Sequence, residues 1–164
     1  MPGQDQHEWG MGLALEEARK AYALGEVPVG CVIVKGGEVI GRGHNLKEAL
    51  RDPTAHAEMI AIRQAAEREG SWRILDASMY VTLEPCPMCA GAVVVARIPE
   101  LVIGTRDPRT GACGSVMDVV GNDRLNHRVS LTFGVREGEC ASLLEEFFAD
   151  LRKAREDPEG CRSG

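Results

Sequence analysis

Residues 29–34 form a nearly unbroken apolar run, Val-Gly-Cys-Val-Ile-Val. A strand whose side chains are apolar on both faces must be covered on both faces, so this run predicts a buried central strand. The pair Gly36-Gly37 and a second strand-like segment at 39–41 follow it, which is typical of a hairpin. A fold built around this hairpin needs helices on both sides of a sheet.

The apolar residues elsewhere recur at helical spacing or in short strand-like runs. Gly25 and Gly70 each stand where a helix would end, and Pro87 stands in a favoured first-turn position. The pattern predicts helices at 8–24, 56–69, 87–96 and 139–155. It predicts further strands at 78–83, 101–103 and 129–131, with a long loop at 104–127.

Strands that alternate with helices indicate an α/β domain. We expect three layers, with helices on both faces of a mixed sheet of five strands, although the pattern does not determine their order. The length of 164 residues is that of one domain. We expect this single domain to span residues 1–156, and residues 157–164 to form a polar C-terminal tail.

Charge and hydropathy exclude some classes of function. The net charge of −6 argues against a protein that coats nucleic acid non-specifically, but it leaves room for a local basic patch. No apolar run approaches the roughly 20 residues needed to span a bilayer, so no membrane contact is expected. Residues 1–10 are polar and carry no apolar signal segment, which predicts a cytoplasmic protein.

The chain has six cysteines, and two of them, Cys86 and Cys89, are three residues apart. In a chain of this length with no signal segment, a metal or catalytic role is more consistent than three disulfides. The scattered cysteines are expected to be reduced thiols, some of them in the core. They are Cys31, Cys113, Cys140 and Cys161.

His56, Cys86 and Cys89 are candidate zinc ligands, because an imidazole and two thiolates suit that metal. Three protein ligands leave one position for water, which is the catalytic arrangement, whereas a structural site has a fourth ligand. Cys113 and His127 are the candidates for a fourth ligand. A redox role for the two cysteines is a further alternative, but it explains neither His56 nor the carboxylate beside it.

That carboxylate, Glu58, is the candidate proton carrier. It could take a proton from water as a general base and return it to the leaving group as a general acid. Residues two apart on a regular helix do not share a face, so the first turn must be oriented to bring His56 and Glu58 together. The alternative is a solvated helix carboxylate.

The signature His-x-Glu followed by Pro-Cys-x-x-Cys is that of zinc deaminases. Longer stretches resemble the bacterial tRNA adenosine deaminases, which are members of the zinc-dependent cytidine deaminase superfamily. The resemblance implies a cytidine-deaminase-like fold, one Zn²⁺ per subunit, a homodimer, and conversion of adenosine to inosine at wobble position 34 in the anticodon stem-loop of a tRNA. The stretches are EVPVGCVIV (26–34), GRGHN (41–45), DPTAHAEMIAIRQA (52–65), MYVTLEPCPMCAGA (79–92), DPRTGACGSVMDV (107–119) and LNHRV (125–129).

The same resemblance implies substrate contacts. Asn45 would hydrogen-bond the flipped base, Val29 would lie against it, and Asp107 would approach the neighbouring nucleotide. Phe147 and Phe148 would lie near the RNA. From the residues alone, Asn45 and Asp107 could equally hold turns. Adjacent helix residues cannot face the same way, so one phenylalanine is expected in the core and the other can be exposed.

The chain departs from the family pattern at two places. The basic residues Arg152, Lys153 and Arg155 run into an acidic stretch at 156–159, so basicity ends early. Cys113 stands where a small residue is more usual. Two alternative functions remain open: a deaminase of a free base or nucleoside such as guanine or cytosine, and a non-catalytic zinc-stabilised RNA-binding subunit. Glu58 argues against the second, since such a subunit needs no proton carrier.

Overall fold

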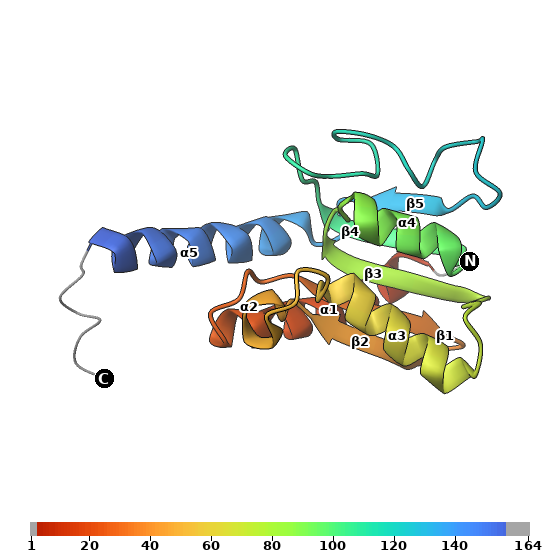
Figure 1. The fold of residues 1–164 in the computed structure, drawn as a ribbon, viewed down its shortest axis with the longest axis horizontal. Helices are drawn as coiled ribbons and strands as arrows, with labels where there is room; N and C mark the ends of the chain where they lie inside the picture. Colours follow the sequence, from red (N-terminus) through yellow and green to blue (C-terminus); the bar gives the residue numbers. More distant parts are fainter. Residues whose placement is uncertain (1–2, 157–164) are drawn as a thin grey trace.

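The computed structural model describes residues 3–156, so the expected tail at 157–164 lies outside the described residues. Helices and strands alternate along most of the chain (Figure 1). In chain order they are α1 (Gln4–Ala23), β1 (Gly30–Lys35), β2 (Glu38–His44), α2 (Lys47–Leu50), α3 (Ala57–Glu69), β3 (Ala77–Leu83), α4 (Pro87–Val95), β4 (Glu100–Thr105), β5 (Ser130–Phe133) and α5 (Glu137–Glu156).

The strands form one mixed five-stranded sheet in the order β2-β1-β3-β4-β5. β1 runs antiparallel to both of its neighbours, whereas β3, β4 and β5 are mutually parallel. The predicted mixed sheet is therefore confirmed, and the structure adds the strand order. The hairpin is also confirmed: Gly36 and Gly37 have φ of 58° and 79°, the left-handed backbone that a two-residue hairpin turn of this type requires.

Helices lie on both faces of the sheet, with α1 and the beginning of α5 on one side and α3 and α4 on the other, while the rest of α5 projects beyond the sheet (Figure 1). The side chains of β1 alternate between the two cores. Cys31 and Ile33 lie in the core beneath α3 and α4, and Val32 and Val34 lie in the core that contains Met11 of α1. The run at 29–34 is thus buried on both faces, and the three-layer α/β/α architecture is confirmed.

Three loops that follow strands meet at one edge of the sheet. β2 runs parallel to β3, because each is antiparallel to β1. The carboxyl ends of β2, β3 and β4 therefore lie at the same edge, which is where open α/β sheets commonly bind ligands. Asn45, Glu84 and Arg106 are the first residues after these strands.

Some elements differ from the sequence predictions at their ends. α1 begins at Gln4 and not at residue 8 as predicted. The difference arises because the first turn is polar, so that no apolar periodicity reveals it. β2 extends to His44, beyond the predicted end at residue 41, and it stays paired with β1 up to the pair His44 and Gly30. The end of this strand includes two glycines and an arginine, which do not show the apolar pattern of a strand. α2 is a single turn, too short to be detected by periodicity. Within residues 3–156, no helix is both long and apolar enough to cross a membrane.

Candidate active site

Three candidate ligands meet at the starts of two helices. His56 and Cys86 are the residues just before α3 and α4, and both have extended backbone, with ψ of 152° and 173°. Cys89 lies in the first turn of α4. The Nδ1 atom of His56 is 3.7 Å from Cys86 Sγ and 3.5 Å from Cys89 Sγ. Two helix starts therefore bring the three side chains together.

This spacing fits a tetrahedral zinc ion. With ligand bonds of about 2.0–2.3 Å, neighbouring ligand atoms lie about 3.5 Å apart. The ligand atoms of His56, Cys86 and Cys89 all lie within 4.8 Å of one another. Among the described residues, neither Cys113 nor His127 joins this group. His127 instead hydrogen-bonds the carbonyl of Ile98 through Nε2, at 2.8 Å. Among the described residues the group therefore has three candidate ligands, the number that the catalytic interpretation requires.

The two thiols are electrostatically unequal. A hydrogen bond from Cys89 lowers the pKa of Cys86 to about 5, and the charge of His56 adds to this effect. The same hydrogen bond and burial raise the pKa of Cys89. The lowered pKa of Cys86 favours the thiolate, the form in which cysteine binds metal. The described cysteines outside the group, Cys31, Cys113 and Cys140, are free thiols as expected, and Cys161 lies outside the described residues.

Glu58 reaches the same site although it is two residues from His56. The helical-face rule does not apply to this pair, because His56 lies before α3 and only Glu58 lies on it. The side chain is 3 % exposed. Burial raises the pKa of the Glu58 carboxyl, and hydrogen bonds from its own backbone N–H and from Cys89 offset only part of that rise. A buried carboxyl of this kind is suited to hold and release a proton.

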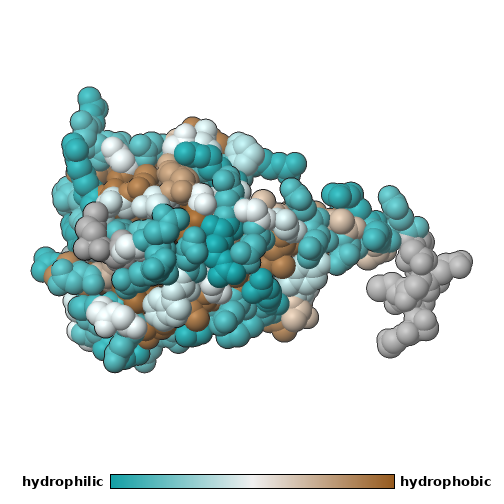
Figure 2. Space-filling model, turned by 180° about the vertical axis from the view of Figure 1, so that it is seen from behind, coloured by the Kyte–Doolittle hydropathy of each residue, from teal (hydrophilic) through white to brown (hydrophobic). Residues whose placement is uncertain are grey.

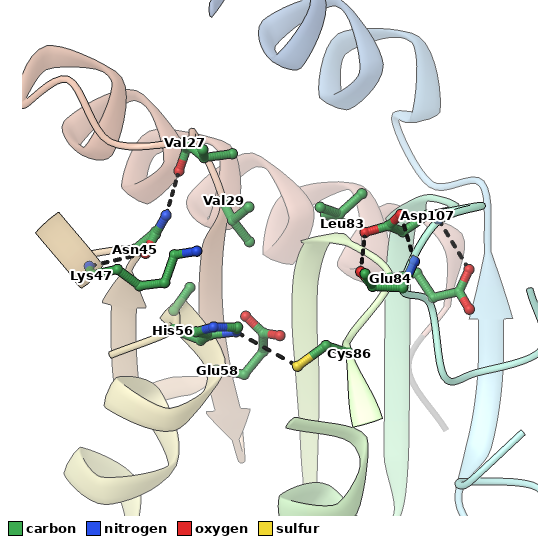
Figure 3. Close-up of a pocket in the computed structure, with 12 residues that line it drawn as sticks. Val27, Val29, Asn45, Lys47, His56, Glu58, Leu83, Glu84, Cys86 and Asp107 are labelled. Carbon is green, nitrogen blue, oxygen red and sulfur yellow. Dashed lines mark hydrogen bonds between the residues drawn. The ribbon is translucent and has the colours of Figure 1, made fainter. Parts of the chain in front are cut away.

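A cavity of about 170 Å³ lies beside these residues (Figure 3). His56, Glu58 and Cys86 lie together at its base, Asn45 and Lys47 stand on one side, and Leu83 and Asp107 stand on the other. The predicted substrate residues Val29, Asn45 and Asp107 all line it. The full lining comprises Val27, Val29, Asn45, Lys47, His56, Ala57, Glu58, Leu83, Glu84, Cys86, Asp107 and Thr110.

Asn45 both holds its turn and lines the cavity. Its Nδ2 donates to the carbonyl of Val27 at 3.3 Å, and its Oδ1 accepts from the backbone N–H of Lys47 at 3.2 Å. A side-chain amide carries two N–H donors and a carbonyl with two lone pairs. Asn45 therefore keeps one donor and one lone pair beyond these two contacts.

Asp107 likewise has a structural role. Its carboxylate accepts hydrogen bonds from the backbone N–H groups of Arg109 and Thr110, at 2.9 and 3.2 Å, and from the Thr110 hydroxyl at 2.8 Å. These contacts form a turn after β4, as the alternative interpretation expects. The same turn places Asp107 and Thr110 in the wall of the cavity. The contact of Asp107 with a neighbouring nucleotide stays a prediction.

Sequence reasoning missed several lining residues, among them Lys47, Glu84 and Thr110. Lys47 begins the one-turn helix α2, in which the backbone N–H groups of Glu48 and Ala49 donate to the buried Glu26 carboxylate at 2.8 and 3.2 Å. Glu84 was detectable only as a carboxylate two residues before a ligand. Burial raises the pKa of Glu84, but hydrogen bonds from Ser115 and from backbone N–H groups outweigh it, so this pKa lies below its usual range.

A larger groove of about 650 Å³ adjoins the cavity and shares Val27, Leu83 and Asp107 with it. The groove runs between the loop after β4 and helix α5. Figure 2 shows α5 projecting from the body with mostly hydrophilic side chains. The groove side of α5 combines basic and apolar residues. The remaining groove residues are Arg106, Pro108, Arg109, Leu144, Glu145, Phe148, Leu151, Arg152 and Arg155.

The two phenylalanines of α5 have different environments. Phe147 is 7 % exposed and its ring centroid lies 5.5 Å from that of Tyr22 in α1. The Tyr22 hydroxyl donates a hydrogen bond to Asp150, which also joins α1 to α5. Phe148 is 41 % exposed and lines the groove. The expectation that one ring is in the core and the other exposed is confirmed.

Residues 4–105 match the profile of the cytidine and deoxycytidylate deaminase zinc-binding region, the part of the chain that holds the candidate ligands. The chain belongs to this deaminase family. A relative from Bacillus subtilis (strain 168) named tRNA-specific adenosine deaminase is 47 % identical over 150 residues, which cover 92 % of this chain and 93 % of the relative. The resemblance to tRNA adenosine deaminases is confirmed at this level.

Solved structures of deaminases share the fold. One comes from a study of A-to-I editing by tRNA:A34 deaminases at the wobble position of transfer RNA. It is 44 % identical, with a TM-score of 0.80, and the match covers 83 % of this deaminase and 99 % of that chain. A guanine deaminase from Nitrosomonas europaea is 25 % identical, with a TM-score of 0.76 over 87 % of this chain and 84 % of its own. The higher sequence identity, 44 % against 25 %, thus favours the tRNA deaminases over the deaminases of free bases.

Proposed function

We propose that this protein deaminates adenosine to inosine at the wobble position of a tRNA, in the anticodon stem-loop. The observation that carries the proposal is a cavity with a zinc-binding group and a buried Glu58 at its base, opening beside a groove lined with arginines. A small cavity accepts one base, and the groove accepts the strand on either side of it. The similarity to tRNA-specific adenosine deaminases supports this substrate. A tRNA substrate implies work in the cytoplasm.

His56, Cys86 and Cys89 hold one Zn²⁺ per chain in this proposal. Zinc held there would supply a water molecule whose pKa is lowered toward roughly 7 to 9, so that it becomes a nucleophile near neutral pH. The chain's own contribution is to hold the two sulfurs and the imidazole nitrogen at the ligand spacing given above, and to keep Glu58 within the same buried pocket.

Glu58 moves the protons. It accepts a proton from the attacking water while the water oxygen bonds to the ring carbon that carries the amine. It donates this proton to the ring nitrogen. It then takes the second proton from the newly added hydroxyl group and donates it to the amine, which leaves as ammonia while the carbon–nitrogen bond breaks and the carbonyl forms. Atoms and charges balance as adenosine plus water giving inosine plus ammonia. Because burial raises the pKa of Glu58, its carboxyl holds a proton more readily than an exposed one, which suits a group that acts in turn as base and acid.

The cavity residues recognise the extruded base. A duplex or loop base must leave its stack to reach such a pocket. Val29 packs against the base, and the remaining amide donor of Asn45 bonds its edge. Asp107, at the boundary of cavity and groove, contacts the neighbouring nucleotide. These contacts orient the reacting carbon above Glu58.

The groove binds the backbone and the bases beside the target. Arg152 and Arg155 attract phosphates, and the exposed ring of Phe148 offers a stacking surface. Phe147 acts differently, since its buried ring packs against Tyr22 and fixes α5 over the groove. This local basic surface reconciles an RNA substrate with a net charge of −6.

The deciding experiment is a deamination assay on two kinds of substrate in parallel. We expect inosine in an anticodon stem-loop with adenosine at the wobble position, and no ammonia from a panel of free bases and nucleosides. Ammonia released only from a free base would keep the deaminase chemistry and refute the RNA substrate. An inactive protein that binds the stem-loop would favour the non-catalytic RNA-binding subunit.

A matched pair of variants tests the groove in the same assay. Arg152→Ala removes a basic side chain that lines the groove, whereas Lys153→Ala removes its neighbour, which does not line it. We expect the first change to weaken stem-loop binding and to lower the slope of log K against log salt by about 0.7–0.9 per lost phosphate contact. Equal effects of the two changes would place the RNA elsewhere.

Assembly and zinc content are decided together by native mass spectrometry of freshly purified, unchelated protein. We propose a homodimer with one zinc in each 17.7 kDa chain. Exposed apolar side chains on α4 and on the loop that follows β4, such as Val95 and Val116, offer surface for a second copy. A mass of one chain would refute the dimer, and protein without zinc would refute the metal site.

A further inference from the structure

Glu84 lies in the short connection between β3 and α4 and is 2 % exposed. Its carboxylate accepts hydrogen bonds from four donors on a distant part of the chain. Oε1 accepts from the backbone N–H of Asp107 at 3.2 Å and from the Ser115 hydroxyl. Oε2 accepts from the backbone N–H groups of Cys113 and Ser115, at 3.0 and 3.2 Å. One buried side chain therefore organises the whole segment 107–115.

This segment forms the side of the cavity opposite Asn45. Asp107 and Thr110 line the cavity and are joined to each other by the turn described above. The backbone adds two links: Gly111 N–H donates to the carbonyl of Asp107 at 3.0 Å, and Ala112 N–H donates to the carbonyl of Pro85 at 2.8 Å. The segment is therefore attached at both ends to the connection that carries Glu84.

The fit around the Glu84 carboxylate is close. A Cβ added at Gly111 would lie 2.3 Å from Glu84 Oε2 and 2.5 Å from the carbonyl oxygen of Asp107, so no side chain fits at this position. Glu84 also precedes Cys86 by two residues. The same short connection thus contacts the recognition side of the cavity and supplies a candidate metal ligand at its base (Figure 3).

We propose that Glu84 is a positioning residue, which fixes the segment carrying Asp107 and Thr110 at a set distance from Cys86 and Glu58. This inference rests on the proposed function. Glu84 does not need to touch the substrate. It acts through Asp107 and Thr110, by holding them where the nucleotide beside the target base binds. A carboxylate suits the task because it is an acceptor at both oxygens, and all four partners are donors.

Glu84→Gln tests the inference with little change of volume. The amide keeps one acceptor oxygen, and its NH₂ group replaces the other. The N–H groups that donated to the replaced oxygen then face another donor, so at least one backbone N–H loses its partner. We expect KM for the stem-loop to rise on the order of 10-fold or more, with kcat changed by less than about 3-fold and zinc content unchanged. An unchanged KM, or loss of zinc, would overturn the positioning role.

Glu100→Gln is the matched control. Glu100 is 6 % exposed and lies at the opposite end of β4, away from the cavity, and its Oε1 has no hydrogen-bond partner among the described residues. The same substitution there is expected to leave KM and kcat at wild-type values. A rise of KM equal to that of Glu84→Gln would show a general effect of losing a buried carboxylate and would refute the specific role.

Amide hydrogen exchange provides a readout that does not need activity. The backbone N–H groups of Asp107, Cys113 and Ser115 are expected to exchange faster in Glu84→Gln, while amides of α1 keep their wild-type rates. Unchanged exchange in the loop would refute the anchor even if the stem-loop is deaminated. A wild-type enzyme that forms no inosine would refute the proposed function, and the exchange rates would still decide whether Glu84 holds the loop.

Ser115→Ala keeps the test decisive if Glu84→Gln does not fold. It removes one of the four donors, the Ser115 hydroxyl, and leaves the carboxylate and the backbone donors in place. We expect a smaller rise of KM, of about 3-fold, together with faster exchange of the Cys113 and Ser115 amides. Wild-type KM and exchange rates in this variant would contradict the inference.

Discussion

Glu58→Ala should lower the rate of deamination by at least ~10²–10⁴-fold while zinc remains bound. The reason is that Glu58 is the buried carboxyl at the base of the cavity, and its pKa is raised chiefly by burial. Without it, no side chain of the proposed mechanism carries protons from the water to the base and the amine. The measurement is single-turnover inosine formation in the stem-loop, with zinc determined on the same sample.

The control for this change is Glu67→Ala. Glu67 lies on the same helix, α3, but is exposed and does not line the cavity. It should keep both the rate and the metal. Two results would contradict the assignment of Glu58: a rate within a few-fold of wild type, or loss of zinc, which would make Glu58 a fourth ligand instead of the proton carrier.

The folding pattern was predictable where local sequence determines it. The apolar run at 29–34 and the Gly36-Gly37 pair lead directly to a central strand in a hairpin. The strand order was not predictable, because the pairing of β1 with β3 joins segments that are far apart in the chain. The local sequence pattern also does not predict that β4 and β5 run parallel, because this direction depends on how the connection between them crosses the sheet.

The same contrast holds for the site. His56, Glu58, Cys86 and Cys89 were recognisable because a metal with a proton carrier needs those residue types at short spacings. Glu84 was not, since its four donors come from a segment more than twenty residues later in the chain. What a side chain of this kind does becomes visible only when the loops after β3 and β4 lie together.

The orientation of His56 and Glu58 shows how a local rule can mislead. Two residues on one helix at this spacing point in different directions, which predicts a difficult geometry. The structure removes the difficulty because α3 starts at Ala57, one residue later than predicted, and His56 has extended backbone. Helix ends are the least predictable part of a helix, and here the end decides whether the two side chains meet.

Cys86→Ala should abolish zinc binding and lower thermal stability at the same time. Cys86 provides one of only three candidate ligands among the described residues, and its thiol has a pKa lowered to about 5 by the hydrogen bond from Cys89. Metal that binds only the folded chain stabilises it by about 4 kcal/mol when its concentration is about 1,000 times Kd. For a chain of this size, that loss corresponds to a fall in Tm of roughly 10 °C.

Cys140→Ala is the matched control, because Cys140 is also a buried free thiol but lies in the other core, between α5 and the sheet. It should reduce stability modestly through lost packing and keep the metal. Treating the wild type with a chelator adds a second comparison: its Tm should fall to that of Cys86→Ala, whose own Tm should not respond to the chelator. Wild-type zinc content in Cys86→Ala would refute the assignment of Cys86 as a ligand. An equal loss of zinc in Cys140→Ala would show that zinc binding depends on the overall stability of the fold and not on the Cys86 thiolate.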